Sequence, residues 1–157
     1  MGRAAAHKRT REALKALRRL ARVFAGAIPM EQCLRGSIYW LGGRQSRARD
    51  SWNHAIEAAE RLGSRLHLAL IHQEVGRLTQ ERPHLEEGLR LFEEIGATLQ
   101  VSRTLRYLGK TVAEENHETA AQFFERALTL HDHMNAEHEF SLVQAEHRKV
   151  CIDRPGF

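Results

Sequence analysis

The clearest candidates for chemistry in this sequence are its ten histidines, and metal binding is the chemistry they would support. Three of them, His131, His133 and His138, lie close together along the chain. On a helix, His131 and His133 would point about 200° apart and could not share one ion, whereas His133 and Glu137 could. Two ligands do not complete a site, so we expect exposed polar residues at a helix end, and no metal or other cofactor.

A second candidate is Gly109-Lys110-Thr111, which matches the end of a phosphate-binding loop. The first glycine of that motif should stand at position 104, which is Thr104, and no strand is expected before it. The two cysteines, Cys33 and Cys151, form no CxxC pair, and no serine has the sequence context of a nucleophile. We therefore expect a protein that is not an enzyme, with reduced thiols and a cytoplasmic location.

The basic charge of the chain is concentrated at its N-terminus. The whole sequence has 24 Lys and Arg against 20 Asp and Glu, and eight of the basic residues but only one acid lie in residues 1–25. We expect this segment to form an amphipathic helix that buries Leu14, Leu17, Leu20 and Phe24 and leaves its arginines in water. Membrane or nucleic-acid binding by this helix remains an alternative, although we expect no nucleic-acid partner. No segment has the roughly 18–20 apolar residues of a membrane span.

Apolar residues recur at helical spacing almost throughout, which predicts an all-α fold. Glycine, proline and polar clusters between these stretches divide the chain into eight expected helices. They are 8–25, 30–41, 46–62, 65–79, 83–95, 98–114, 118–134 and 137–150. Their short connections indicate antiparallel neighbours, in either a bundle or a solenoid of helix pairs.

Internal repetition favours the solenoid. Residues 60–63 recur as residues 93–96, an offset of 33, and a period near 34 is typical of helical-pair repeats. Small residues in both helices of a pair, with an aromatic beside them, would let the two helices pack closely. The second copy aligns with the first at offset 33 or 40. These structural positions are Gly36, Tyr39, Ala48, Trp52 and Ala55, then Gly76, Gly88, Phe92 and Ile95, then Gly109, Ala120, Phe124 and Ala127.

On these residues the chain resembles tetratricopeptide-repeat (TPR) proteins. More narrowly, residues 14–109 resemble the repeat region at the C-terminal end of multidomain class III nucleotide cyclase and STAND ATPase signalling proteins. The resemblance implies an α-α superhelix. Its expected parts are a basic leading helix at 1–28, repeats within 29–150 at about 30–62, 65–95 and 98–134, a half-repeat or cap at 137–150, and a tail at 151–157.

The resemblance also implies a non-catalytic adaptor or scaffold that binds a protein or peptide in a concave groove. A regulatory C-terminal fragment of a cyclase or ATPase signalling protein is the alternative it leaves open. Arginine, lysine and tyrosine in the later part of the expected groove suit an acidic peptide or helix. The repeat register places in the groove Ser37, Trp40, Gln73, Arg77, Arg103, Arg106, Tyr107 and Lys110.

Overall fold

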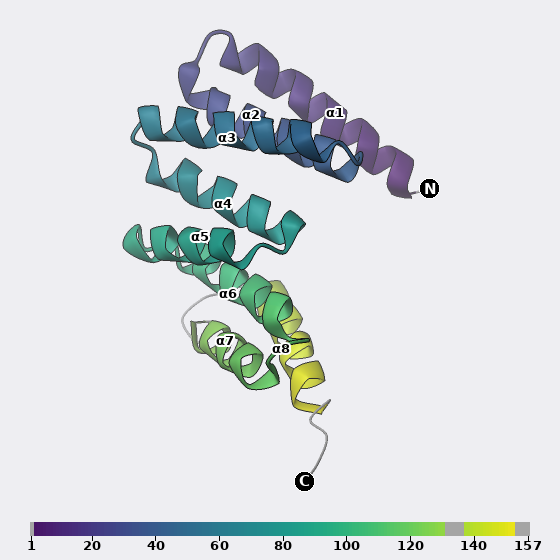
Figure 1. The fold of residues 1–157 in the computed structure, drawn as a ribbon, viewed down its shortest axis with the longest axis vertical. Coiled ribbons are helices and arrows are strands. Elements are labelled where there is room, and N and C mark those ends of the chain that lie inside the picture. The colour runs from purple at the N-terminus through teal and green to yellow at the C-terminus, as the bar shows by residue number, and fades with distance from the viewer. Residues whose placement is uncertain (1, 131–136, 153–157) are drawn as a thin grey trace. The chain divides into compact units, whose positions relative to one another are not determined.

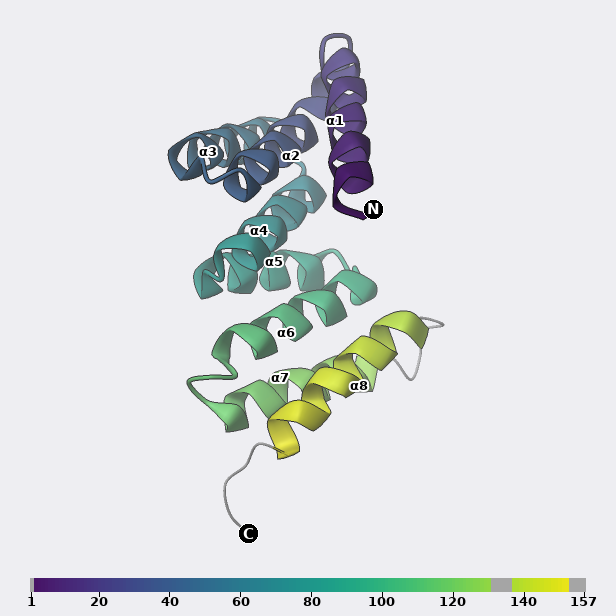
Figure 2. The same cartoon turned by 90° about the vertical axis from the view of Figure 1, so that its right-hand side faces the viewer.

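The computed structural model describes residues 2–130 and 137–152, and within these ranges the fold is all-α, with no strand (Figures 1 and 2). The all-α prediction is confirmed. Residues 131–134, at the end of one expected helix, lie outside the described residues. The elements are α1 (Gly2–Ala21), a short 3-10 helix η1 (Ala25–Ala27), α2 (Ile28–Leu41), α3 (Gln45–Arg61), α4 (Arg65–Thr79), α5 (Arg82–Glu94), α6 (Thr98–Val112), α7 (His117–Thr129) and α8 (Glu137–Ile152).

The chain forms two compact units, residues 1–74 and residues 75–157, and the boundary falls within α4. In the first unit α1 and α3 both pack against α2. In the second unit α6 packs against α5 and α7, and α8 packs mainly against α7. The site described below lies wholly in the second unit.

Three of the described helices end in the same way, and for α3 and α5 the repeated sequence predicts it. After α2, Gly43 has φ of +75° and Arg44 N bonds to the Tyr39 carbonyl at 2.8 Å. Gly63 and Gly96 follow α3 and α5 with φ of +60° and +70°, a conformation that glycine adopts without steric cost. The next amide then bonds back to the helix, from Ser64 N to the Ala59 carbonyl and from Ala97 N to the Phe92 carbonyl, at 3.0 and 2.9 Å. These are the bonds of a Schellman cap, which satisfies carbonyls that the helix end leaves unpaired.

In the first unit, close packing of α2 on α3 depends on a glycine. A Cβ at Gly36 would collide with the indole ring of Trp52, which is 2% exposed. The Trp52 Nε1 donates a hydrogen bond to the Cys33 carbonyl at 3.2 Å, so the buried ring keeps its polar atom paired. Ala48 and Ala55 on α3 are fully buried, as the repeat pattern predicts.

The second unit repeats this contact twice, and it shows how the second copy aligns. A Cβ at Gly109 would lie 2.7 Å from Cζ of Phe124, and one at Gly76 would lie 2.6 Å from Cγ of Leu85. Gly76 is thus related to Gly36 by offset 40, whereas Leu85 is related to Trp52 by offset 33. The second copy is therefore related to the first by an offset of 40 in its first helix, α4, and by an offset of 33 in its second helix, α5.

For the second helix of this copy the contact selects offset 33 of the two alignments left open, and one expected core position, Ile95, is wrong. Leu85, not Phe92, takes the place of Trp52, because α5 begins only two residues after α4 and its first turn faces Gly76. Ile95, expected in the core, is 39% exposed because it lies at the C-terminal end of α5. Phe92 is fully buried all the same.

The remaining structural positions pack as expected. Tyr39 is the one of them that is only half-buried. The others are buried: Gly88, Ala120, Phe124 and Ala127.

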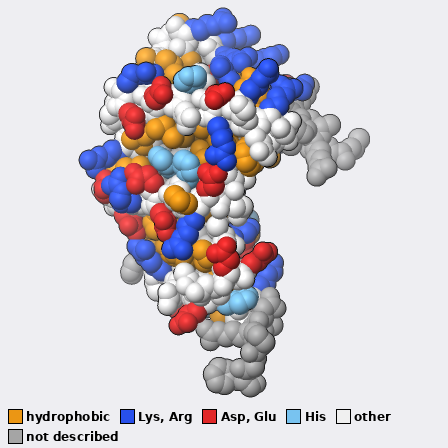
Figure 3. Space-filling model, viewed as in Figure 1, with side chains coloured by type: hydrophobic (Ala, Val, Ile, Leu, Met, Phe, Trp, Pro, Cys, Tyr) orange, Lys and Arg blue, Asp and Glu red, His pale blue; other side chains and the backbone are white. Residues whose placement is uncertain are grey.

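The leading helix differs from the prediction at its C-terminal end. It ends at Ala21 rather than near residue 25, and Leu20 and Phe24, expected in the core, are 46% and 59% exposed. The reason is that Phe24 has extended backbone, with its ring folded over Gly26, where a Cβ would lie 2.6 Å away. Lysine and arginine side chains gather over α1 in Figure 3.

A buried carboxylate attaches α1 to α2. Glu31 on α2 is 3% exposed, and its Oε1 lies 3.2 Å from Nε of Arg18 on α1 and 2.5 Å from Nη2 of Arg35. At least one arginine of the basic helix therefore has a structural role.

We predict that Gly109→Ala lowers the free energy of unfolding by about 1–2 kcal/mol, because overpacking against Phe124 outweighs the helix propensity of alanine. Urea denaturation measures this change. In a Phe124→Leu background the same substitution should be neutral or stabilising, because the colliding ring is gone. Equal effects in the two backgrounds would contradict the proposed contact.

Candidate functional site

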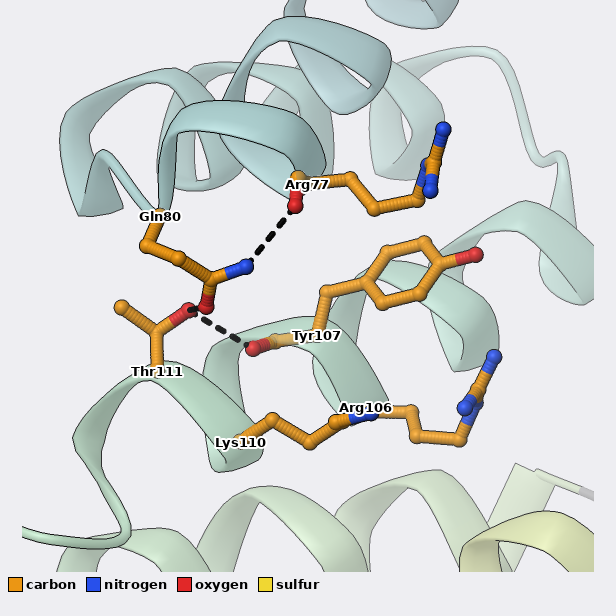
Figure 4. Close-up of a pocket in the computed structure, with 6 residues that line it drawn as sticks. All are labelled: Arg77, Gln80, Arg106, Tyr107, Lys110 and Thr111. Carbon is orange, nitrogen blue, oxygen red and sulfur yellow. Dashed lines mark hydrogen bonds between the residues drawn. The ribbon is translucent and has the colours of Figure 1, made fainter. Parts of the chain in front are cut away.

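A cationic pocket in the second unit is the candidate site (Figure 4). It has a volume of about 390 Å³. Its lining comes from the end of α4 and from the second half of α6, and it includes four of the predicted groove residues. The lining residues are Arg77, Gln80, Arg106, Tyr107, Lys110 and Thr111.

Gln80 and Thr111 hold the two sides of the pocket together. Gln80 has φ of +61°, which ends α4, and its Nε2 donates to the Arg77 carbonyl at 2.8 Å. The Thr111 hydroxyl lies 3.3 Å from Oε1 of Gln80 and 3.0 Å from the Tyr107 carbonyl oxygen. Neither residue was predicted for this site: the left-handed backbone of Gln80 leaves no signal in the sequence, and Thr111 was considered only as the end of a phosphate-binding motif.

The cationic side of the pocket is built around Tyr107. The Arg106 guanidinium lies over the Tyr107 ring, 4.9 Å from its centroid, which is a cation–π distance. In Figure 4 the ring is seen between the side chains of Arg77 and Arg106. The lining thus offers three cations and an aromatic ring, and it includes no acidic residue.

Two of these cations, Arg106 and Lys110, bind carboxylates within the unit, as does the neighbouring Arg103. Arg106 Nε lies 3.0 Å from Oε1 of Glu139 on α8, and its Nη1 lies 3.3 Å from Oε1 of Glu146. Lys110 Nζ lies 3.3 Å from the same Glu146 oxygen, and Arg103 Nε lies 3.2 Å from Oε2 of Glu139. Among Arg103, Arg106 and Lys110, the Lys110 side chain is the most exposed, at 52%, and the Arg106 side chain the least, at 11%.

The other predicted groove residues lie in the first unit. Ser37 is 5% exposed, and its hydroxyl lies within hydrogen-bond distance of the Cys33 carbonyl and of Glu74 Oε1, so it is part of the packing rather than of an open surface. Trp40 is half-buried, with its ring 5.6 Å from that of Trp52. Gln73 is half-buried on α4.

Gly109-Lys110-Thr111 does not form a phosphate-binding loop. All three residues lie inside α6, where Gly109 packs against Phe124 and the Thr111 hydroxyl lies 3.0 Å from the Tyr107 carbonyl oxygen. A phosphate-binding loop needs its amides free at the start of a helix.

In the part of the chain that the structure describes, the histidines do not join a metal-ligand cluster. Among the described residues, no group of three or more His, Cys, Asp or Glu side chains could hold an ion. His131 and His133 lie outside these residues. Near His138, the Glu139 carboxylate is committed to Arg103 and Arg106.

One Cys–His contact was missed by the sequence analysis, although its i, i+4 spacing could have indicated it. Cys151 Sγ lies 3.4 Å from Nε2 of His147, and Oε1 of Glu125 lies 3.7 Å from the same nitrogen. In a catalytic triad the acid would contact the opposite ring nitrogen. Both contacts fall on the same ring nitrogen, so this arrangement has no catalytic geometry.

Helices within the described residues are too short or too polar to cross a membrane. Comparison of the chain with protein-family models, with curated proteins and with solved structures finds no match. Function must therefore be inferred from the residues and geometry of this chain.

We predict that Glu139→Ala lowers the free energy of unfolding by about 2–3 kcal/mol, because it leaves the largely buried guanidinium of Arg106 without its closest carboxylate. Glu137→Ala, an exposed position in the same first turn of α8, is the matched control and should change stability by less than about 0.5 kcal/mol. Thermal or urea unfolding measures both. Equal losses would show that Glu139 acts only as a negative charge in the first turn of α8 and not through Arg106.

Proposed function

We propose that the chain is a TPR-like superhelix of helix pairs that acts as a non-catalytic protein-interaction module and binds an acidic, helical segment of a protein partner. The cationic pocket formed by Arg77, Arg106, Tyr107 and Lys110 is the proposed contact surface. A cytoplasmic adaptor or scaffold role in signalling, predicted from the resemblance to TPR proteins, agrees with this proposal.

The observation that carries the proposal is the way α8 binds α6. Glu139 and Glu146 are seven residues apart, about two helical turns, and so lie on one face of α8. Both contact Arg106, and Glu146 also contacts Lys110 at the pocket. This cationic surface is thus complementary to carboxylates spaced along a helix.

The pocket lining also includes N–H donors from a second helix. A guanidinium has five N–H donors, and two parallel donors can bind one carboxylate. Arg77 lines the pocket at the end of α4 and so gives a ligand a cation from a second helix. The face of Tyr107 adds a flat apolar surface for a side chain of the partner.

The pocket favours acidic helices over phosphate groups alone. Its cations come from two helices, and the Tyr107 ring lies among them, so the surface is extended rather than focused on one anion. Charge complementarity of this kind mainly sets the association rate and the choice of partner.

We predict that the full chain binds an acidic amphipathic peptide of about four helical turns that has glutamates seven residues apart. Fluorescence anisotropy with a labelled peptide measures the affinity, and a peptide with glutamine at those positions is the ligand control. Arg77→Glu with Lys110→Glu should weaken binding of the acidic peptide about tenfold or more, because both substitutions place negative charge at the pocket. Binding should also weaken as salt is raised.

Arg148→Glu with Lys149→Glu is the matched control variant, since both residues are exposed on α8 and the charge change is the same. This control should bind the acidic peptide as the parent chain does. Equal affinity for the acidic and neutral peptides, or an equal loss in the control variant, would contradict the proposal.

A further inference from the structure

A second surface, on the first unit, combines exposed apolar side chains with a basic stripe. Leu20, Val23 and Phe24 form an apolar tip at the end of α1, with 46%, 84% and 59% of each residue exposed. Val23 N and Phe24 N both bond to the Leu20 carbonyl, at 3.0 and 2.8 Å, so the turn after α1 holds the three residues together. Exposed apolar side chains gathered at one place are an unusual feature of a surface.

The basic stripe runs along α1 on the flank opposite to Leu20. Arg11, Lys15 and Arg18 are three or four residues apart and so lie on one flank of the helix, with Arg19 next to them, and Arg22 follows in the turn after the helix. All are exposed, although Arg18 also binds Glu31 of α2. Ala13, Ala16 and Leu20 lie on the opposite flank and are also exposed.

The placement of α1 presents these groups outward. Leu14 and Leu17 are half-buried, and the Arg18–Glu31 ion pair fixes the helix on α2. Only part of the apolar face of α1 is thereby used in packing. The apolar tip and the stripe remain available on a helix that the fold holds in place.

We infer that α1 and the turn after it bind the surface of an anionic phospholipid membrane. Arginine and lysine are attracted to acidic headgroups, and Leu20, Val23 and Phe24 would enter the boundary between headgroups and acyl chains. An amphipathic helix that lies in the interface binds by this combination of charge and apolar area. The inference is independent of the acidic-peptide pocket, which lies in the second unit.

Two other occupants fit the surface less well. Nucleic acid would use the stripe, but the apolar tip gains nothing from phosphate groups. A second copy of the chain would bring one stripe against another, and three side chains are far from the roughly 800 Å² per partner that a specific interface buries.

Co-sedimentation of the full chain with vesicles tests the inference. Vesicles of phosphatidylcholine with phosphatidylserine should bind the chain, and vesicles of phosphatidylcholine alone should not, because the stripe needs anionic headgroups. Arg19→Glu with Arg22→Glu should reduce binding about tenfold or more. Val23→Ser with Phe24→Ser should reduce it by a similar factor, and Val23→Ser alone, at the most exposed position, should reduce it in part.

Arg47→Glu with Arg61→Glu is the matched control, since both arginines are exposed on α3 and the charge change is the same. The control should bind anionic vesicles as the parent chain does, and circular dichroism should show every variant as helical as the parent. Absence of binding to the anionic vesicles, or equal binding to both vesicle types, would overturn the inference. Binding to a DNA duplex that survives Val23→Ser with Phe24→Ser, or self-association that the same variant abolishes, would instead assign the surface to nucleic acid or to a second copy.

Discussion

The rest of this structure depends on close contacts between a glycine in one helix and a bulky side chain in the next. Gly36 faces Trp52, Gly76 faces Leu85, and Gly109 faces Phe124, and in each case a Cβ would collide with that side chain. The glycine costs helix propensity, but the ring or leucine fills the space that it leaves and the two helices approach closely. Because these contacts fix which face of α4 and α6 is packed, they also fix which face carries Arg77, Arg106, Tyr107 and Lys110.

Each unit also uses one buried carboxylate to attach a terminal helix. Glu31 binds Arg18 and Arg35 where α1 meets α2, and Glu139 binds Arg103 and Arg106 where α8 meets α6. A buried ion pair of this kind contributes less net stability than its Coulomb energy, but losing one partner is costly. Such a pair therefore mainly specifies where a helix docks. The proposed function uses the same interaction: carboxylates on a helix of the partner would pair with basic side chains at the pocket.

Local patterns predicted most of the fold, whereas contacts between distant residues could not be predicted. Helical periodicity and repeat spacing placed Ala48, Ala55 and Phe124 in the core, because burial of a helix face follows from neighbours on the same helix. Periodicity could not show that α1 ends at Ala21, or that Leu85 rather than Phe92 faces Gly76, since both depend on where a neighbouring element begins. For the site, the repeat register brought four of the six lining residues together. It could not predict that Gln80 and Thr111 line the pocket, or that Arg106 pairs with Glu139.

Hydrogen–deuterium exchange of the full chain, with and without an acidic helical peptide, tests whether the surface of α6 at the cationic pocket binds acidic helices. Exchange reports local opening, which a bound ligand suppresses where it contacts the protein. The account predicts slower exchange in α6 and at the end of α4, residues 75–79, with residues 2–61 unchanged. Protection confined to residues 2–61, or no protection at a saturating peptide concentration, would contradict it.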